Sequence, residues 1–153
     1  MKFLLLEDES LLRKNIAAYL RKKGFEVVEF DDGKTLLEKA DIADFDAFIL
    51  DINVPNFNGL EILEFIRNND SKTPVVLISS YTDTKDVLNG FKLGCADYIK
   101  KPFDLLMFIY LTGIINIKRN LWRIRNDVTS NNSLNFCKPY LFINSTCSCS
   151  SCC

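Results

Sequence analysis

The chain has 153 residues, of which 48% are hydrophobic and 25% are charged, and its net charge is −1. This composition is typical of a globular chain with enough apolar residues for one core, and it shows no overall bias toward nucleic acid or membranes. Histidine is absent, which excludes Ser-His-Asp and Cys-His catalysis and histidine-based metal sites. Any phosphohistidine that this protein uses therefore belongs to a partner.

Charge and cysteine are unevenly distributed along the chain. Residues 1–117 carry 14 Lys and Arg against 19 Asp and Glu, a net of −5, whereas residues 118–153 carry 5 against 1, a net of +4. Five of the six cysteines lie at or after Cys137, so we expect no disulfide framework in the main domain. Only four apolar residues separate Lys2 from an acidic run. No secretory signal is therefore expected, and we expect a cytoplasmic location.

Apolar runs and stretches of helical spacing alternate along the chain. Short apolar runs predict buried strands, and apolar residues at a 3.6-residue period predict helices. The predicted strands are residues 2–6, 26–30, 46–50, 75–79 and 96–99. A helix is predicted after each strand, and the last one follows Asp104. The apolar residues of the first helix are Leu11, Leu12, Ile16, Ala17, Tyr19 and Leu20, and those of the second are Leu36, Leu37 and Ala40. Those of the third are Leu60, Ile62, Leu63, Phe65 and Ile66, and those of the fourth are Val87, Leu88 and Phe91. This alternation favours a parallel sheet covered on both faces, with right-handed crossovers.

Polar residues stand where four of these strands end. Glu7 and Asp8 follow the first strand, Asp51 the third, Ser79 ends the fourth, and Lys101 follows the fifth. In an open parallel sheet, ligands bind at the carboxyl ends of the strands. Each residue alone has a plain structural interpretation, such as a helix cap for Asp8, a strand-end hydroxyl for Ser79 or a solvated cation for Lys101. The coincidence of all five at strand ends favours a functional site.

The chemistry of this set points to phosphoryl transfer. Three neighbouring carboxylates repel one another, and Mg²⁺ relieves the repulsion because two carboxylates and the main-chain carbonyl of Asn53 leave positions for water and phosphate oxygens. We expect Asp51 to be the nucleophile and to become an acyl phosphate. Lys101 and the cation would then neutralise the phosphoryl oxygens, and Ser79 would donate a hydrogen bond to one of them. A cis bond between Lys101 and Pro102 could aim the ammonium inward.

Four motifs in register resemble the receiver domain of two-component response regulators, over residues 1–118. The motifs are residues 4–9, 51–59, 74–80 and 94–103. The resemblance implies a doubly wound (βα)5 fold of the flavodoxin-like type, with a five-stranded parallel sheet in strand order 2-1-3-4-5. It also implies a protein that catalyses only its own phosphorylation and dephosphorylation, and so is not an enzyme in the ordinary sense.

By the same resemblance, Asp51 accepts a phosphoryl group from a sensor histidine kinase. Asp8, Asp51 and the carbonyl of Asn53 would hold Mg²⁺ directly. Glu7 stands where relatives frequently have aspartate and would act through water. The absence of histidine from this chain agrees with a kinase that supplies the phosphohistidine.

The resemblance further implies a switch formed by Ser79 and Tyr98. The Ser79 hydroxyl would move toward the phosphate, and the Tyr98 ring would turn inward into the space that becomes vacant. A half-buried aromatic side chain packed on its strand is the plain structural alternative for Tyr98.

The resemblance weakens after Asp104. Residues 105–117 carry no charge, whereas relatives with a winged-helix DNA-binding domain use charged positions of this helix in dimer contacts. The stretch is too short to span a bilayer, which needs about 20 apolar residues. A helix covered by a partner or by a second copy in a homodimer, and a stretch of altered reading frame, are the two open explanations.

Residues 119–133 are predicted to be a linker, and residues 134–153 an atypical Cys-rich tail. The tail is too short for a winged helix, so we do not expect this chain to bind DNA. We expect the remnant of a winged-helix transcription regulator with an aborted output domain. The four thiols from position 147 onward could bind a soft metal, and the terminal pair is similar to a lipidation signal, but an unstructured end is the preferred interpretation.

Three rival functions stay open beside the receiver. A haloacid-dehalogenase-like phosphatase would need a second acid two residues after Asp51, where this chain has Asn53. A flavodoxin-like flavin binder would need a hydroxyl-rich loop after the first strand, where this chain has the acidic residues 7–9. The third rival is a non-signalling remnant, whose altered last helix prevents output. We favour a phosphorylation switch that serves transcription regulation.

Overall fold

The computed structural model describes residues 1–69, 72–80, 84–104, 107, 110, 113–117 and 120. The elements are β1 (Lys2–Leu6), α1 (Ser10–Lys22), β2 (Glu26–Phe30), α2 (Gly33–Lys39), the 3-10 turn η1 (Ile42–Asp44), β3 (Ala47–Asp51), α3 (Gly59–Asn69), β4 (Val75–Ser79), α4 (Thr84–Lys92) and β5 (Asp97–Lys100). The described positions from 107 to 120 are also helical, as predicted for the last helix. Apart from residue 120, the predicted linker and Cys-rich tail lie outside the described residues.

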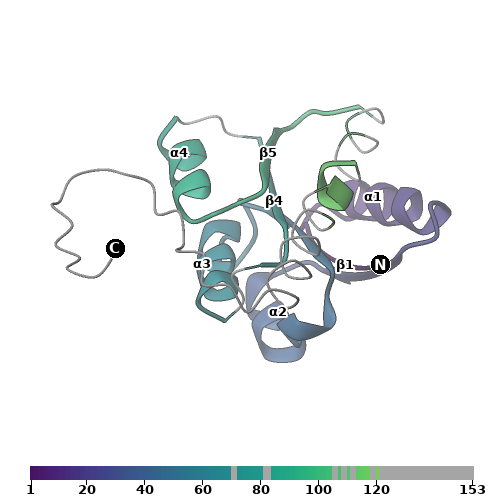
Figure 1. The fold of residues 1–153 in the computed structure, drawn as a ribbon, viewed down its shortest axis with the longest axis horizontal. Coiled ribbons are helices and arrows are strands. Elements are labelled where there is room, and N and C mark those ends of the chain that lie inside the picture. Colours follow the sequence, from purple (N-terminus) through teal and green to yellow (C-terminus); the bar gives the residue numbers. More distant parts are fainter. Residues whose placement is uncertain are drawn as a thin grey trace, which may run out of the picture.

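The five strands form one parallel sheet in the order β2-β1-β3-β4-β5. This confirms the predicted α/β fold and its strand order. Figure 1 shows α1 and the last described helical segment on one face of the sheet, and α2, α3 and α4 on the other. Because all strands are parallel, their carboxyl ends open on the same edge, with β1 and β3 side by side at its centre.

Side chains of the strands alternate between two apolar cores, as the two-residue period of a strand requires. Phe3 and Leu5 of β1 lie in the core under α1, whereas Leu4 and Leu6 lie in the core under α2 and α3. All four are fully buried, which explains why the strand is a continuous apolar run rather than an alternating one. The central strands are thus fixed on both faces, and so are the residues at their ends.

The strand boundaries differ from the prediction by one residue in two places. β3 is Ala47–Asp51 rather than 46–50, and β5 is Asp97–Lys100 rather than 96–99. Asp51 is therefore the last residue of its strand and pairs with Ile78 of β4. Its main chain belongs to the sheet, so the carboxylate projects from a rigid position.

One of the apolar residues at helical spacing in α1 is exposed. Leu11 is 67% exposed, whereas Ile16, Ala17 and Leu20 are buried. Leu11 precedes Ile16 by five positions, which places it about 140° around the helix from Ile16. The apolar spacing located the helix correctly, and Leu11 lies off its buried face.

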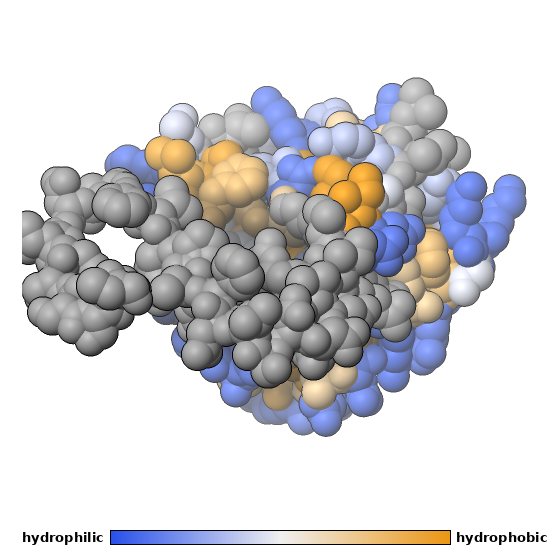
Figure 2. Space-filling model, viewed as in Figure 1, coloured by the Kyte–Doolittle hydropathy of each residue, from blue (hydrophilic) through white to orange (hydrophobic). Residues whose placement is uncertain are grey.

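Apolar side chains also stay exposed on α4 and on the last described helical segment. Leu88, Phe91, Tyr110 and Ile117 are all exposed, whereas Ile115 is fully buried against the core. Figure 2 shows apolar side chains over α4 and over this last segment. Among the described residues, none of the helices combines the length and apolar character needed to cross a membrane.

The acidic residues before α1 do not cap this helix, so that interpretation of Asp8 is wrong. The N-cap residue is Glu9, which makes no side-chain capping hydrogen bond. Instead, Arg13 Nη1 donates to the carbonyl oxygens of Glu7 at 2.6 Å and Asp8 at 3.1 Å. Glu29 forms an ion pair with the same guanidinium, with its Oε2 3.8 Å from Arg13 Nε. The turn that carries the two acids is thus fixed through its main chain.

We expect Arg13→Ala to lower the free energy of unfolding by about 1–3 kcal/mol, because two hydrogen bonds from a charged donor are lost. Urea unfolding of both proteins measures the difference. Lys14→Ala is the matched control, since Lys14 is exposed on the same helix and its removal should cost less than about 0.5 kcal/mol. Equal, small effects of the two substitutions would show that Arg13 does not stabilise the turn.

Candidate functional site

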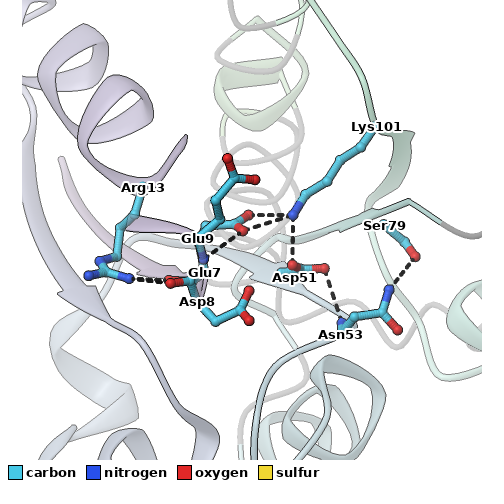
Figure 3. A network of polar contacts seen from close by, with 8 residues as sticks. All are labelled: Glu7, Asp8, Glu9, Arg13, Asp51, Asn53, Ser79 and Lys101. Carbon is cyan, nitrogen blue, oxygen red and sulfur yellow. Dashed lines mark hydrogen bonds and ion pairs between the residues drawn. The ribbon is translucent and has the colours of Figure 1, made fainter. Parts of the chain in front are cut away.

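Four charged side chains meet at the carboxyl ends of β1, β3 and β5 (Figure 3). Glu7, Asp8 and Asp51 each place one carboxylate oxygen within 4.8 Å of the other two. Lys101 Nζ lies 2.8 Å from Glu7 Oε1 and 2.7 Å from Asp51 Oδ2. The structure thus brings together four of the residues that the sequence placed at strand ends. The bond between Lys101 and Pro102 is cis, which is the arrangement that the sequence allowed for.

Burial makes the pKa values of these side chains depend on one another's charge. Glu7 is fully buried and Asp51 is 2% exposed, and buried carboxylates are stable only when a cation or hydrogen-bond donors compensate them. Burial raises the pKa of Glu7 to about 7, and the charge of Asp51 adds to the rise while Lys101 opposes it. Burial lowers the pKa of Lys101, but the hydrogen bonds and charges of Asp51 and Glu7 outweigh it, so this pKa is raised. The lysine is therefore the internal counter-charge of the acids.

The loop after β3 is held close to Asp51 by main-chain contacts. The N–H of Asn53 donates to Asp51 Oδ1 at 3.0 Å, and the N–H of Ile52 donates to the Ile78 carbonyl at 3.0 Å. A Cβ atom at Gly59 would collide with the main-chain carbonyl of Asp51. Glycine at this position therefore lets α3 begin directly against the end of β3.

The same loop is held from its other side by the start of α2. The N–H of Gly33 donates to the Pro55 carbonyl at 3.2 Å, and Asn56 Nδ2 donates to Asp32 Oδ1 at 3.3 Å. Asn56 has a φ of 67°, in the left-handed region that asparagine tolerates better than most residues. A Cβ atom at Gly33 would collide with the carbonyl oxygen of Phe57. The loop that carries the Asn53 carbonyl is thus fixed between two helices.

Ser79 lies at the end of β4 and is buried. Its Oγ accepts a hydrogen bond from Asn53 Nδ2 at 3.1 Å. Figure 3 shows the hydroxyl pointing toward this amide and not toward the carboxylate of Asp51. Sequence reasoning used only the main-chain carbonyl of Asn53, and nothing in the residue pattern indicates where its amide points.

Tyr98, the other predicted switch residue, lies on β5. Its ring is half-buried and packs against the core that contains Leu77, under α3. The described contacts therefore agree with the packing interpretation of the ring. The inward turn of Tyr98 stays a prediction.

The donor set of the cluster fits a hard divalent cation. Its protein ligands are all oxygens, the ligands that Mg²⁺ prefers. Glu7 Oε2 is buried and makes no hydrogen bond, although Lys101 Nζ lies at an ion-pair distance of 2.8 Å. Within the described part of the chain, the carbonyl oxygen of Asn53 accepts no hydrogen bond either. A buried carboxylate oxygen without a hydrogen-bond donor, and the carbonyl of the exposed residue Asn53, are thus available to a cation.

Comparison with known sequences identifies the same kind of domain. The family model of the response regulator receiver domain matches residues 3–109. The transcriptional regulatory protein CrdR of Helicobacter pylori is 39% identical over 105 residues, which cover 68% of this chain and 49% of CrdR. The response regulator ArlR of Staphylococcus saprophyticus is 42% identical over 104 residues, covering 68% and 47%. This chain thus spans about half the length of these curated relatives.

A further relative matches more of the chain. The probable transcriptional regulator ycf29 of Pyropia yezoensis is 37% identical over 141 residues, which cover 88% of this chain and 62% of ycf29. That share is larger than residues 1–118 alone. The boundaries predicted for the linker and the tail stay predictions.

Solved structures resemble this fold closely. The non-phosphorylated HemR receiver domain from Leptospira biflexa superimposes with a TM-score of 0.71 at 27% identity, covering 74% of this chain and 93% of that one. The response regulator DrrB of Thermotoga maritima, described as an OmpR/PhoB homolog, gives 0.65 at 29% identity, covering 80% and 52%. The curated relatives include transcriptional regulators, and DrrB is described as an OmpR/PhoB homolog. The chain belongs to the response regulator receiver domain family.

Proposed function

We propose that this chain is a phosphorylation switch in which Asp51 accepts a phosphoryl group from the phosphohistidine of a sensor histidine kinase. The observation that carries the proposal is the buried cluster in which Lys101 contacts both Glu7 and Asp51 within 2.8 Å, beside Asp8. A receiver is a signalling domain rather than a catalytic one. The only reaction proposed for this chain is the gain and loss of its own phosphoryl group.

Asp51 is fixed for attack before a donor arrives. Its Oδ1 accepts the N–H of Asn53, and its Oδ2 accepts from Lys101 Nζ. One carboxylate oxygen of Asp51 forms a bond to phosphorus while the bond between phosphorus and the partner's imidazole nitrogen breaks. Asp51 then carries an acyl phosphate. The partner's histidine is neutral once its nitrogen has taken up a proton. The ammonium of Lys101 neutralises charge on the transferred group.

Mg²⁺ would be held by Asp8, Asp51 and the carbonyl of Asn53, with Glu7 acting through water. When bound, it supplies positive charge to the phosphoryl oxygens. With all three carboxylates ionised, the cluster and Lys101 together carry a net charge of −2, which one divalent cation balances. The charge count and the oxygen donors support Mg²⁺ in this role.

After transfer, Ser79 and Tyr98 are proposed to read the phosphoryl group. The Ser79 hydroxyl would donate to a phosphoryl oxygen, and Tyr98 would turn inward. Because CrdR and ycf29 are transcriptional regulators by name, we propose that the switch serves transcription regulation in the cytoplasm. The homodimer through the last helix stays a prediction, with Met107, Tyr110 and Ile117 as its exposed apolar residues.

Two of the rival functions fit the site less well. A haloacid-dehalogenase-like phosphatase lacks its second acid, because the side chain of Asn53 is an amide that donates to Ser79. A flavin phosphate would meet the carboxylates of Glu7 and Asp8 at the end of β1 and be repelled. A non-signalling remnant would keep the same cluster, so failure of the folded protein to gain a phosphoryl group is the result that would indicate it.

We expect Asp51→Asn to abolish labelling by acetyl phosphate and Mg²⁺, because an amide cannot attack phosphorus. The intact mass before and after incubation should show one added phosphoryl group on the wild-type protein and none on the variant. Asp44→Asn is the control, since Asp44 lies in the η1 turn and contacts only Lys2, at 3.9 Å, among the ion pairs of the described residues. Undiminished labelling of Asp51→Asn would overturn the site assignment.

The affinity for Mg²⁺ should fall about five- to ten-fold between about pH 8 and about pH 6. Glu7, whose pKa burial raises to about 7, must be ionised to help to bind the cation, and protonation below this pH opposes binding. Isothermal titration calorimetry at both pH values measures the change. Glu7→Gln should remove most of it, whereas Glu9→Gln, at an exposed neighbour, should retain it. A full pH effect in Glu7→Gln would contradict the role of Glu7.

A further inference from the structure

Asn53 connects the proposed phosphoacceptor to the proposed switch residue. Its main-chain N–H donates to Asp51 Oδ1 at 3.0 Å, and its side-chain Nδ2 donates to Ser79 Oγ at 3.1 Å. Asp51 and Ser79 end the neighbouring strands β3 and β4. The main chain of Asn53 is held by its hydrogen bond to Asp51 at the end of the sheet. The side-chain amide therefore extends to the Ser79 hydroxyl from a main chain with a fixed position.

This contact is one of the interactions that orient the Ser79 hydroxyl. Ser79 is 1% exposed, so its hydroxyl depends on partners inside the protein. The amide nitrogen of Asn53 can only donate, and it therefore binds the hydroxyl oxygen through a lone pair. Figure 3 shows that oxygen on the side of the Asn53 amide, away from Asp51. To reach a phosphoryl group on Asp51, the hydroxyl must leave this position.

We propose that the Asn53 side chain is a positioning residue that holds the Ser79 hydroxyl in its resting orientation and so favours the unphosphorylated conformation. The inference rests on the proposed function, because Ser79 acts as a switch only if Asp51 is phosphorylated. A hydrogen bond present in one of two states shifts their equilibrium by its net contribution. For a hydrogen bond between neutral groups, the shift is about 2- to 12-fold.

Beryllium trifluoride, which mimics a phosphoryl group on aspartate, tests the proposal without a kinase. Its affinity is measured by isothermal titration calorimetry at saturating Mg²⁺ in wild type, Asn53→Ala, Ser79→Ala and the double variant. We expect Asn53→Ala to bind about 2- to 12-fold more tightly than wild type, and the gain to disappear in the Ser79→Ala background. Equal or weaker binding by Asn53→Ala, or the same gain without the hydroxyl, would overturn the proposal.

Ser79→Thr is the matched control for the hydroxyl. It retains a hydroxyl at position 79, so Asn53→Ala should still increase the affinity in this background. A gain that disappears in Ser79→Thr as it does in Ser79→Ala would show that the effect does not pass through the hydroxyl, and would contradict the proposal.

A second measurement separates this inference from the proposed function. The side-chain amide signals of Asn53 in ¹⁵N-labelled protein, assigned by their loss in Asn53→Ala, should shift in Ser79→Ala without any ligand. The signals of Asn56, which donates to Asp32, should not move. Failure of the wild-type protein to bind beryllium trifluoride would contradict the proposed function, whereas unmoved Asn53 signals in Ser79→Ala would contradict the positioning role itself.

Discussion

The rest of the site depends on the contacts of Lys101 with Glu7 and Asp51, because buried carboxylates need a compensating positive charge. Two carboxylates with almost no exposure are stable only when positive charge lies within hydrogen-bond distance, and Lys101 Nζ lies 2.8 Å and 2.7 Å from them. One ammonium does not balance three carboxylates. We propose that the excess negative charge attracts a divalent cation, and that the cation and the lysine together neutralise the phosphoryl group that Asp51 accepts.

The fold fixes the charged groups of the site, whereas the Ser79 hydroxyl is the group that we propose to change partners. β1 and β3 are packed on both faces, Arg13 fixes the turn that carries Glu7 and Asp8, and α2 and α3 hold the loop after Asp51. The Ser79 hydroxyl, by contrast, accepts a hydrogen bond from the side-chain amide of Asn53. A switch needs an element with two arrangements of similar free energy, and we propose this hydroxyl as that element.

The sequence predicts the location of those site residues that directly follow or end a strand, because the strand order of the sheet fixes where they lie. Asp51, Ser79 and Lys101 were placed at one edge because parallel strands share that edge, and the structure places them there. The roles of Arg13 and of the Asn53 amide were not predicted, because each depends on the direction of a long or freely rotating side chain. The contact between Asn53 and Ser79 joins positions 26 residues apart, and no local pattern encodes that distance.

Chemical identification of the modified residue tests the central claim most directly. Borohydride reduces an aspartyl phosphate to homoserine, so wild-type protein treated with acetyl phosphate and Mg²⁺ is reduced, digested and mapped by mass spectrometry. The account predicts homoserine at position 51 and at no other acidic residue. Homoserine at position 8 or elsewhere, or none at all in folded protein that binds Mg²⁺, would contradict it.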